Sequence, residues 1–317
     1  MINFTIVKKL LVIVGPTATG KTALALELAK KFNGEIISAD SRQIYQSMDV
    51  GTGKGIQSAG FRIKKFKKKW TVNDIPIHLY DVITPDKTFS AAEYQQLAYK
   101  VIDQILKRDK LPILVGGTGL YVRAVTEGLK IPKVAPNKKL REHLESRTLT
   151  SLLGELQKVD PKTYEKIDKF NTRRIIRALE IYHQAGEPAS KLKGKFKVKY
   201  DILKVGLTSN RNYLYERADK QADSWFERGF IEEVRNLLKK GYKETFTAMT
   251  SLGYRQVAMF LNQKISLEEA KRRVKWEQHS YIRRQSTWFK KETNINWFDI
   301  AEVGFKKDIG KLVSKWL

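Results

Sequence analysis

The chain has 317 residues and a formal net charge of +26, which comes from 60 Lys and Arg against 34 Asp and Glu. This length allows about two domains with cores of their own. The excess of positive charge indicates a polyanionic partner, either nucleic acid or an acidic membrane surface. Because the chain has no cysteine, disulfides, cysteine metal sites and thiol chemistry are excluded. Its four histidines are scattered, so Mg²⁺ held by oxygen atoms is the ion that we expect.

The apolar run near the N-terminus does not predict a membrane or secretion segment. It lies within MINFTIVKKLLVIVG, is too short to span a bilayer and lacks the small-residue pattern of a cleavage site. It also continues directly into a glycine-rich motif. We therefore expect a cytoplasmic protein with no membrane contact.

Residues 10–22, LLVIVGPTATGKT, match the phosphate-loop spacing G-x-x-x-x-G-K-[ST] at every fixed position. The apolar run predicts a buried parallel strand, and residues 23–32 predict an amphipathic helix. In such a loop the amides and the helix N-terminus point at an anion, a lysine adds charge, and the last hydroxyl can bind Mg²⁺. The alternative, a plain glycine turn, does not explain the complete match. We expect a di- or triphosphate to bind at Gly15, Pro16, Thr17, Ala18, Thr19, Gly20, Lys21 and Thr22.

Residues 35–40, EIISAD, predict a second strand, which is followed by Ser41, Arg42 and Gln43. Ligands of doubly wound sheets gather at the carboxyl ends of the strands. Asp40 is therefore expected near the contents of the phosphate loop and is the first carboxylate to consider for catalysis. The alternative is that Asp40 only caps the next helix.

The next part of the chain predicts a loop and then further strands and helices. Residues 48–69 combine glycines with the basic run FRIKKFKKK, which predicts a mobile loop whose charge either contacts phosphates or is simply a solvated face. Residues 77–83 predict a strand in which His78 has a structural role. Residues 90–106 predict a helix, and residues 112–115 predict a buried strand that ends in the glycine turn GGTG.

From residue 129 to residue 199 the pattern changes to short amphipathic helices without a convincing strand. Asp160 and Pro161 are a suitable N-cap and first residue of a helix. Within residues 171–182, NTRRIIRALEIY, one side is apolar, while Arg173, Arg174 and Arg177 occupy much of the remaining surface. Such a face suits phosphate binding, with ion pairing to Glu180 and other carboxylates as the alternative.

The last third predicts a strand followed by long basic helices. Residues 201–207 predict the strand, and residues 211–240 predict a helix that breaks near Gly229 and carries Arg217 in its first half. Ser266 and Glu269 form a capping-box pattern that opens a helix to about residue 289. This helix is expected to bury Leu267, Ala270, Val274, Tyr281, Gln285 and Trp288 on one side.

The motifs GPTATGKT, SADSRQIY, MDVGTGK, VGGTGLY, RRIIRALEI, TSLGYRQ, SLEEA and RRQSTWFK follow one another across nearly the whole chain. In this order they resemble the bacterial tRNA dimethylallyltransferases of the IPP transferase family. The resemblance implies an α/β fold, a P-loop NTPase-like doubly wound parallel sheet with an inserted all-helical domain. The catalytic core would comprise residues 1–128 and 200–317, with basic C-terminal helices, and residues 129–199 would grip tRNA.

The resemblance also implies an activity. A dimethylallyl group would pass from dimethylallyl diphosphate to N6 of adenosine 37, in the anticodon stem-loop of tRNAs that read codons starting with U. The phosphate loop would hold the diphosphate of the allylic donor together with Mg²⁺, and no nucleotide would be hydrolysed. We expect the enzyme to act as a monomer.

Individual roles follow from the matching positions. Residues 17–22 would line the diphosphate, with Lys21 as its cation and Thr22 on the Mg²⁺, and Arg217 would lie beside it. Asp40 would act as general base and would meet the target nucleotide together with Ser41, Arg42 and Gln43. The further positions that correspond to tRNA contacts are Thr118, Arg141, Arg173, Arg174, Arg177 and Gln256.

Four positions depart from the family pattern. Gly55 stands in place of a proline and Arg173 in place of a glutamine. Gln221 and His279 each stand in place of an arginine, which changes the basic lining expected for the substrate tunnel. The residues expected at the diphosphate are all present.

Other functions that the sequence allows differ in what they leave unexplained. A phosphate-loop kinase of a nucleotide or other small molecule uses residues 15–22 but not the charge of +26 or the arginine-rich helix. An adenylate isopentenyltransferase shares the donor site but has no use for the long insertion. A non-catalytic RNA-binding module leaves the combination of Lys21, Thr22 and Asp40 without a purpose.

Overall fold

The computed structural model describes residues 8–54, 62–66 and 68–317. The chain divides into two compact units. The first consists of Met1–Val122 and Lys199–Leu317, and the second of Arg123–Val198. No helix in the described parts of the chain combines the length and the apolar character that a membrane crossing needs.

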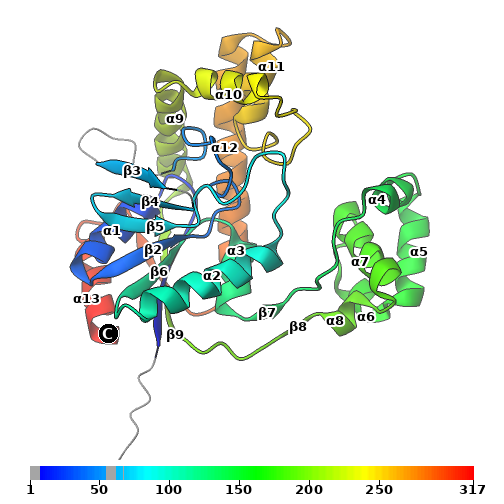
Figure 1. Ribbon diagram of the computed structural model, residues 1–317, viewed down its shortest axis with the longest axis horizontal. Helices are drawn as coiled ribbons and strands as arrows, with labels where there is room; N and C mark the ends of the chain where they lie inside the picture. The colour runs from blue at the N-terminus through cyan, green and yellow to red at the C-terminus, as the bar shows by residue number, and fades with distance from the viewer. Residues whose placement is uncertain (1–7, 55–61, 67) are drawn as a thin grey trace, which may run out of the picture. The chain divides into compact units, whose positions relative to one another are not determined.

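The described residues of the first unit form an eight-stranded sheet with the order β10-β9-β1-β6-β2-β5-β4-β3 (Figure 1). Strands β10 to β5 run parallel, and β4 and β3 extend the sheet as antiparallel strands. This is the mostly parallel α/β sheet that the sequence predicts. The strands are β1 (Lys9–Val14), β2 (Gly34–Ser38), β3 (Ile63–Phe66), β4 (Lys69–Val72), β5 (Ile75–His78), β6 (Leu111–Val115), β9 (Asp201–Thr208) and β10 (Ile295–Asp299).

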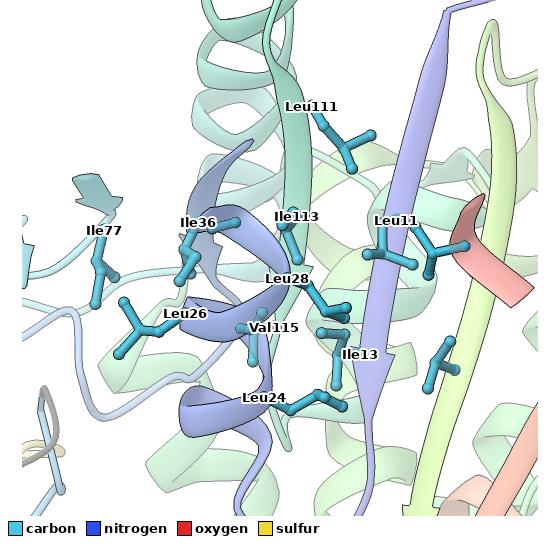
Figure 2. Close-up of a cluster of buried hydrophobic side chains, with 14 of the residues drawn as sticks. Leu11, Ile13, Leu24, Leu26, Leu28, Ile36, Ile77, Leu111, Ile113 and Val115 are labelled. Atoms are coloured by element: carbon cyan, nitrogen blue, oxygen red, sulfur yellow. The ribbon is translucent and has the colours of Figure 1, made fainter. Parts of the chain in front are cut away.

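The core of this unit forms on both faces of β1. Leu11 and Ile13 point to one face, where Leu24 and Leu28 of α1 pack against them (Figure 2). The intervening residues of β1 are also buried, and α2 packs against β2 and β6. The predicted buried strand and the amphipathic helix that follows it are thus confirmed. α1 (Lys21–Lys31) and α13 (Phe305–Trp316) contribute to the same hydrophobic cluster, to which α2 (Ala91–Leu106) contributes no residue. α3 (Gly119–Thr126) leads into the second unit.

The prediction of a loop at residues 48–69 is wrong for those residues of its basic half that the structure describes. β3 lies within the run FRIKKFKKK and pairs with β4, placing Lys65 opposite Trp70. Trp70 is buried, whereas the three residues after Ile63, two lysines and Phe66, are all exposed. β3 therefore lacks the alternation of buried and exposed residues that is typical of a strand. Residues 55–61 and 67 of the predicted loop lie outside the described residues.

The strand predicted at residues 77–83 is also shorter than expected. It is β5, and it ends at His78 because Leu79 takes a left-handed φ of 66°. His78 Nε2 lies 2.6 Å from Glu35 Oε2 on the neighbouring strand β2. This contact agrees with the structural role predicted for His78.

Four helices complete the first unit, α9 (Arg211–Glu227), α10 (Phe230–Lys239), α11 (Tyr254–Leu261) and α12 (Leu267–Phe289). The break predicted near Gly229 lies between α9 and α10, and the φ of this glycine is 86°. α9 and α12 run antiparallel, because His279 pairs with Asp219 at 2.8 Å and Lys275 with Asp223 at 2.9 Å. These two helices form one wall of the site described below.

The prediction for α12 is partly wrong. The Ser266 hydroxyl accepts from the Glu269 amide, but the Glu269 carboxylate pairs with Arg272 and Arg273, so only half of the capping box forms. Tyr281, Leu267 and Trp288 lie at the edges of the buried stripe and stay partly exposed. The residues that are buried are Ala270, Val274, Gln278, Ile282, Gln285 and Phe289.

The second unit is built from short helices around its own core of Leu144, Leu152, Leu156, Ile175 and Leu179. Its helix α6 begins as predicted, with Asp160 accepting from the Thr163 amide and a proline in the first turn. A two-residue strand pair, β7 with β8, was not predicted. The elements are β7 (Leu129–Lys130), α4 (Lys138–Glu145), α5 (Leu149–Val159), α6 (Pro161–Lys166), α7 (Thr172–Ala185), α8 (Ala189–Leu192) and β8 (Gly194–Lys195).

Candidate active site

The glycine-rich loop after β1 is folded back on itself. Gly15 has a φ of 142°, and a Cβ there would lie 2.3 Å from the carbonyl oxygen of Leu207, so no larger residue fits. The Thr19 hydroxyl and the Lys21 ammonium donate to the carbonyl of Pro16 at 2.8 and 2.6 Å. The loop leads into the N-terminus of α1, where backbone amides attract an anion.

Lys21 carries the charge at this end of α1. Desolvation of its ammonium lowers the pKa of Lys21 to about 8, and the attraction of Asp40 opposes this shift. A bound anion stabilises the charged form of a poorly solvated ammonium. Lys21 is thus suited to bind a diphosphate.

The segment after β2 forms a tight turn. One carboxylate oxygen of Asp40, Oδ1, accepts from the Arg42 amide at 2.8 Å. The described residues that follow form turns and no helix, so the alternative that Asp40 caps a helix is wrong. The Ser41 amide donates to the Thr118 hydroxyl at 3.0 Å, and Gln43 Nε2 donates to the carbonyl of Thr52 at 3.0 Å. The turn is held on both sides, so Asp40 is fixed beside the phosphate loop.

A cavity of about 1000 Å³ joins the phosphate loop to this turn. Arg217 reaches its rim from α9, and its Nε donates to the carbonyl of Ala18 at 2.7 Å. Gly15, Pro16, Thr19 and Thr118 lie outside the lining, where they shape the loop and the turn. The predicted site residues that line the cavity are Thr17, Ala18, Gly20, Lys21, Thr22, Asp40, Ser41, Arg42, Gln43 and Arg217.

Two residues of α12 line the same cavity and were not predicted as site residues. Gln285 accepts from the Thr17 amide at 2.8 Å and donates to the carbonyl of Gly117 at 3.1 Å, so it connects two strand-end loops. Tyr281 contacts the Thr118 hydroxyl, and burial together with the charge of Asp40 raises the pKa of Tyr281. Their partners are far away in sequence, so only the helix periodicity could have indicated that they face inward.

Glu233 on α10 is a further residue that sequence reasoning missed. Its Oε2 accepts from the amides of Asp49 and Val50 at 2.8 Å, and its Oε1 accepts from the Gly51 amide at 3.3 Å and the Tyr254 hydroxyl at 2.6 Å. Gly51, Thr52 and Gly53 of this loop line the cavity. Glu233 therefore fixes one wall of the cavity.

Gln256 is placed differently from the other predicted tRNA-contacting residues of the first unit. It is buried, its Nε2 donates to Glu277 at 2.5 Å, and its Oε1 accepts from the Gly253 amide at 3.1 Å. The side chain lies at the start of α11 and lines a smaller cavity of about 320 Å³ with Trp276. Its amide already has protein partners.

The predicted arginines of the second unit fall into two pairs. Arg141 binds both carboxylate oxygens of the buried Glu180 at 2.8 Å, and Arg177 pairs with the same carboxylate, as the ion-pairing alternative proposes. Burial favours a higher pKa for Glu180, but these partners outweigh it and lower the pKa. Arg173 and Arg174 are exposed and have no ion pair with any described residue.

The donor atoms near the phosphate loop suit a hard, oxygen-binding cation. The Thr22 hydroxyl and the Asp40 carboxylate line the same cavity. Within residues 8–54, 62–66 and 68–317, no group of three His, Cys, Asp or Glu side chains is placed to hold a metal by itself. The residues present therefore fit an Mg²⁺ that takes most of its ligands from a bound diphosphate and water.

Comparison with known proteins identifies the family. The protein-family model described as IPP transferase matches residues 43–292. The chain is 40% identical over 314 residues to the tRNA dimethylallyltransferase of Thermomicrobium roseum, covering 98% of this chain and 92% of the relative. It is 42% identical over 305 residues to that of Halothermothrix orenii, covering 94% and 89%. The chain belongs to the tRNA dimethylallyltransferase family.

Solved structures show the same fold. A tRNA isopentenylpyrophosphate transferase from Bacillus halodurans superposes on this transferase with a TM-score of 0.70 at 35% identity, covering 97% of this chain and 96% of that one. A eukaryotic dimethylallyltransferase described as acting on tRNA gives a TM-score of 0.77 at 26% identity, covering 96% and 78%. Both the sheet and the helical insertion of this transferase are therefore those of its family.

Proposed function

We propose that this transferase attaches a dimethylallyl group to N6 of adenosine 37 of tRNA, using one cavity for both substrates. The observation that supports this most strongly is that Lys21, Thr22 and Arg217 line the same cavity as Asp40. The first three suit an anionic leaving group, and the last suits removal of a proton. A non-catalytic binding module needs neither, and a phosphate-loop kinase leaves the charge of +26 and the arginine-rich helix without a use.

The phosphate-loop side of the cavity binds the donor. The loop amides, Lys21 and Arg217 surround the diphosphate and stabilise the negative charge that develops on it as the allylic carbon–oxygen bond breaks. Mg²⁺ bound to the Thr22 hydroxyl and the diphosphate would add Lewis-acid stabilisation of that leaving group. The bonding electron pair leaves with the diphosphate.

The Asp40 side of the cavity handles the base. The adenine leaves its stack to enter the cavity, and its N6 forms the new bond to the allylic carbon while one N6 proton passes to Asp40. The lone pair of this amine is delocalised into the ring, so an oriented carboxylate helps the attack. The bond from the Arg42 amide to Asp40 Oδ1 keeps that carboxylate in place and leaves Oδ2 for the substrate.

The helical insertion at residues 129–199 is proposed to grip the tRNA stem-loop. Arg173 and Arg174 are its exposed cations on α7 and suit phosphates. Arg141 and Arg177 support this role indirectly, because they join α4 to α7 through Glu180. We also propose that the enzyme works as a monomer, because the phosphate loop and the turn with Asp40 line the cavity within one chain. We expect it to act in the cytoplasm, where bacterial tRNA is found.

The test uses purified protein, dimethylallyl diphosphate, Mg²⁺ and unmodified tRNA. We expect equal amounts of diphosphate and of tRNA prenylated at adenosine 37, measured by phosphate assay and by mass spectrometry of nuclease fragments. A matched reaction replaces the donor with ATP. Turnover of ATP without RNA, together with no prenylated fragment, would support a kinase and refute the proposal.

A further inference from the structure

Four buried polar atoms in the cavity wall have no hydrogen-bond partner among the described residues. They are Oε1 of Gln221, Nε1 of Trp225, and both Nε2 and Oε1 of Gln278. Gln278 is 1% exposed and Trp225 is 5% exposed. Buried polar groups are costly when they lack partners. A ligand in the cavity is therefore expected to satisfy them.

These atoms come from neighbouring parts of α9 and α12. The pairs His279–Asp219 and Lys275–Asp223 fix the antiparallel register of the two helices, which brings Gln278 to the level of Gln221. The unpartnered atoms therefore form one polar wall, contributed by two packed helices.

This wall lies next to the residues that handle the base. Along α12, Gln285 binds the phosphate loop, Tyr281 contacts Thr118, and Gln278 follows about one turn further on. A Cβ on Gly53 would lie 3.8 Å from Gln221 Nε2, and the Gly53 carbonyl accepts from Gln43. The polar wall thus borders the turn that carries Asp40.

The chemistry of these atoms fits a base better than the donor tail. A dimethylallyl tail is apolar and cannot satisfy a carboxamide. An adenine edge offers an N6–H donor beside a ring-nitrogen acceptor, and a glutamine amide matches that pair with two hydrogen bonds. Gln278 has both its donor and its acceptor available for this purpose.

We propose that Gln278 recognises the edge of the adenine in the cavity. Its Oε1 accepts one N6 proton and its Nε2 donates to the adjacent ring nitrogen, which leaves the second N6 proton for Asp40. Gln278 is in this way a specificity-determining residue that also turns the amine toward the donor. The inference rests on the proposed function.

The experiment is a double-mutant cycle. One change removes the amide of Gln278, and the other removes a ring nitrogen of the adenine. Synthetic anticodon stem-loops carry adenosine, 7-deazaadenosine or 1-deazaadenosine at position 37, and kcat/KM is measured for wild type and Gln278→Leu. With wild type, one deaza analogue is expected to lower kcat/KM by roughly tenfold or more. Gln278→Leu loses a similar factor with adenosine and shows no further loss with that analogue.

Two further variants complete the design. Gln278→Glu keeps an acceptor for N6 but loses the donor to the ring nitrogen. Its kcat/KM is therefore expected not to change with the same deaza analogue. This variant keeps the test valid even if Gln278→Leu folds poorly. Gln104→Leu, on the exposed side of α2, is the matched control and is expected to behave as wild type.

The inference is overturned if both Gln278 variants lose as much activity with each deaza analogue as wild type does, because independent effects mean no contact. It is also overturned if neither analogue affects wild type. A wild-type enzyme that leaves ordinary adenosine 37 unmodified would instead refute the proposed function, so the two failures are distinguishable.

Discussion

Asp40 combines two properties that a general base needs. It is oriented by the Arg42 amide and it lines the cavity that Lys21 shares. Asp40→Asn keeps the shape and the acceptor of that hydrogen bond but removes the basic carboxylate. We expect kcat to fall by about 10²–10⁴-fold, with tRNA affinity nearly unchanged.

Single-turnover prenylation and filter binding of tRNA measure the two quantities for Asp40→Asn. The control is Asp308→Asn, an exposed carboxylate on α13 that pairs with Lys311 and is expected to behave as wild type. A kcat near the wild-type value would remove Asp40 from the role of base.

The pKa of Lys21 predicts a pH dependence for donor capture. Desolvation lowers this pKa to about 8, so the ammonium is charged below pH 8 and loses its proton as the pH rises through this value. In the free enzyme kcat/KM for dimethylallyl diphosphate should therefore fall above about pH 8. Lys21→Arg keeps its charge and should lose this alkaline limb; a profile that is the same for both proteins would contradict the assignment.

At the scale of residues, the sequence predicts the cavity lining only where a motif is local. Lys21 and Thr22 follow from fixed spacing within one loop, and Asp40 follows from its position at a strand end. Gln285 could not be found in this way, because the amide that it binds is 268 positions away. Glu233 acts on backbone amides, which leave no trace in the side-chain pattern.

Among the elements, the loop at residues 49–53 depends on α10 for its position. Glu233 accepts three of its amides. Glu233→Ala is expected to raise hydrogen exchange at Asp49, Val50 and Gly51 and to lower kcat/KM, because part of the cavity wall is released.

The matched control for this loop is Glu232→Ala. That side chain is the exposed neighbour of Glu233 and pairs with Arg235. Exchange is followed by mass spectrometry of peptides that contain residues 49–53. Equal protection in Glu233→Ala and wild type would show that the loop is held by other contacts.

Elements were predictable where apolar periodicity was clear. β1, α1, α2 and α7 have such patterns. β3 does not, because the three residues after Ile63 are exposed, two of them lysines, and only pairing with β4 makes it a strand. On α12 the aromatic residues Tyr281 and Trp288 suggested the wrong centre for the buried stripe, since large side chains at its edges are only partly covered.

At the scale of the whole molecule, the charge of +26 predicts salt-dependent tRNA binding. Arg173→Ala together with Arg174→Ala removes two exposed cations of α7, so we expect weaker binding at every salt concentration. The slope of log Kd against log salt should decrease by about one to two.

The contrast for this prediction is Arg141→Ala. That change leaves the buried Glu180 without its bidentate partner, so it should lower the melting temperature. Its effect on the salt dependence of tRNA binding should be smaller. Binding isotherms at several salt concentrations and thermal unfolding separate the two effects. An unchanged slope in the Arg173 and Arg174 variant would mean that this face does not contact phosphates.

In the proposed reaction an anion-binding loop releases diphosphate from an allylic donor while Asp40 prepares an RNA base. The most direct measurement is mass spectrometry of nucleosides in tRNA from cells with and without this protein. We predict that prenylated adenosine 37 is lost without it, returns with the wild-type chain and does not return with Asp40→Asn. Full prenylation in cells that lack the protein would contradict the account.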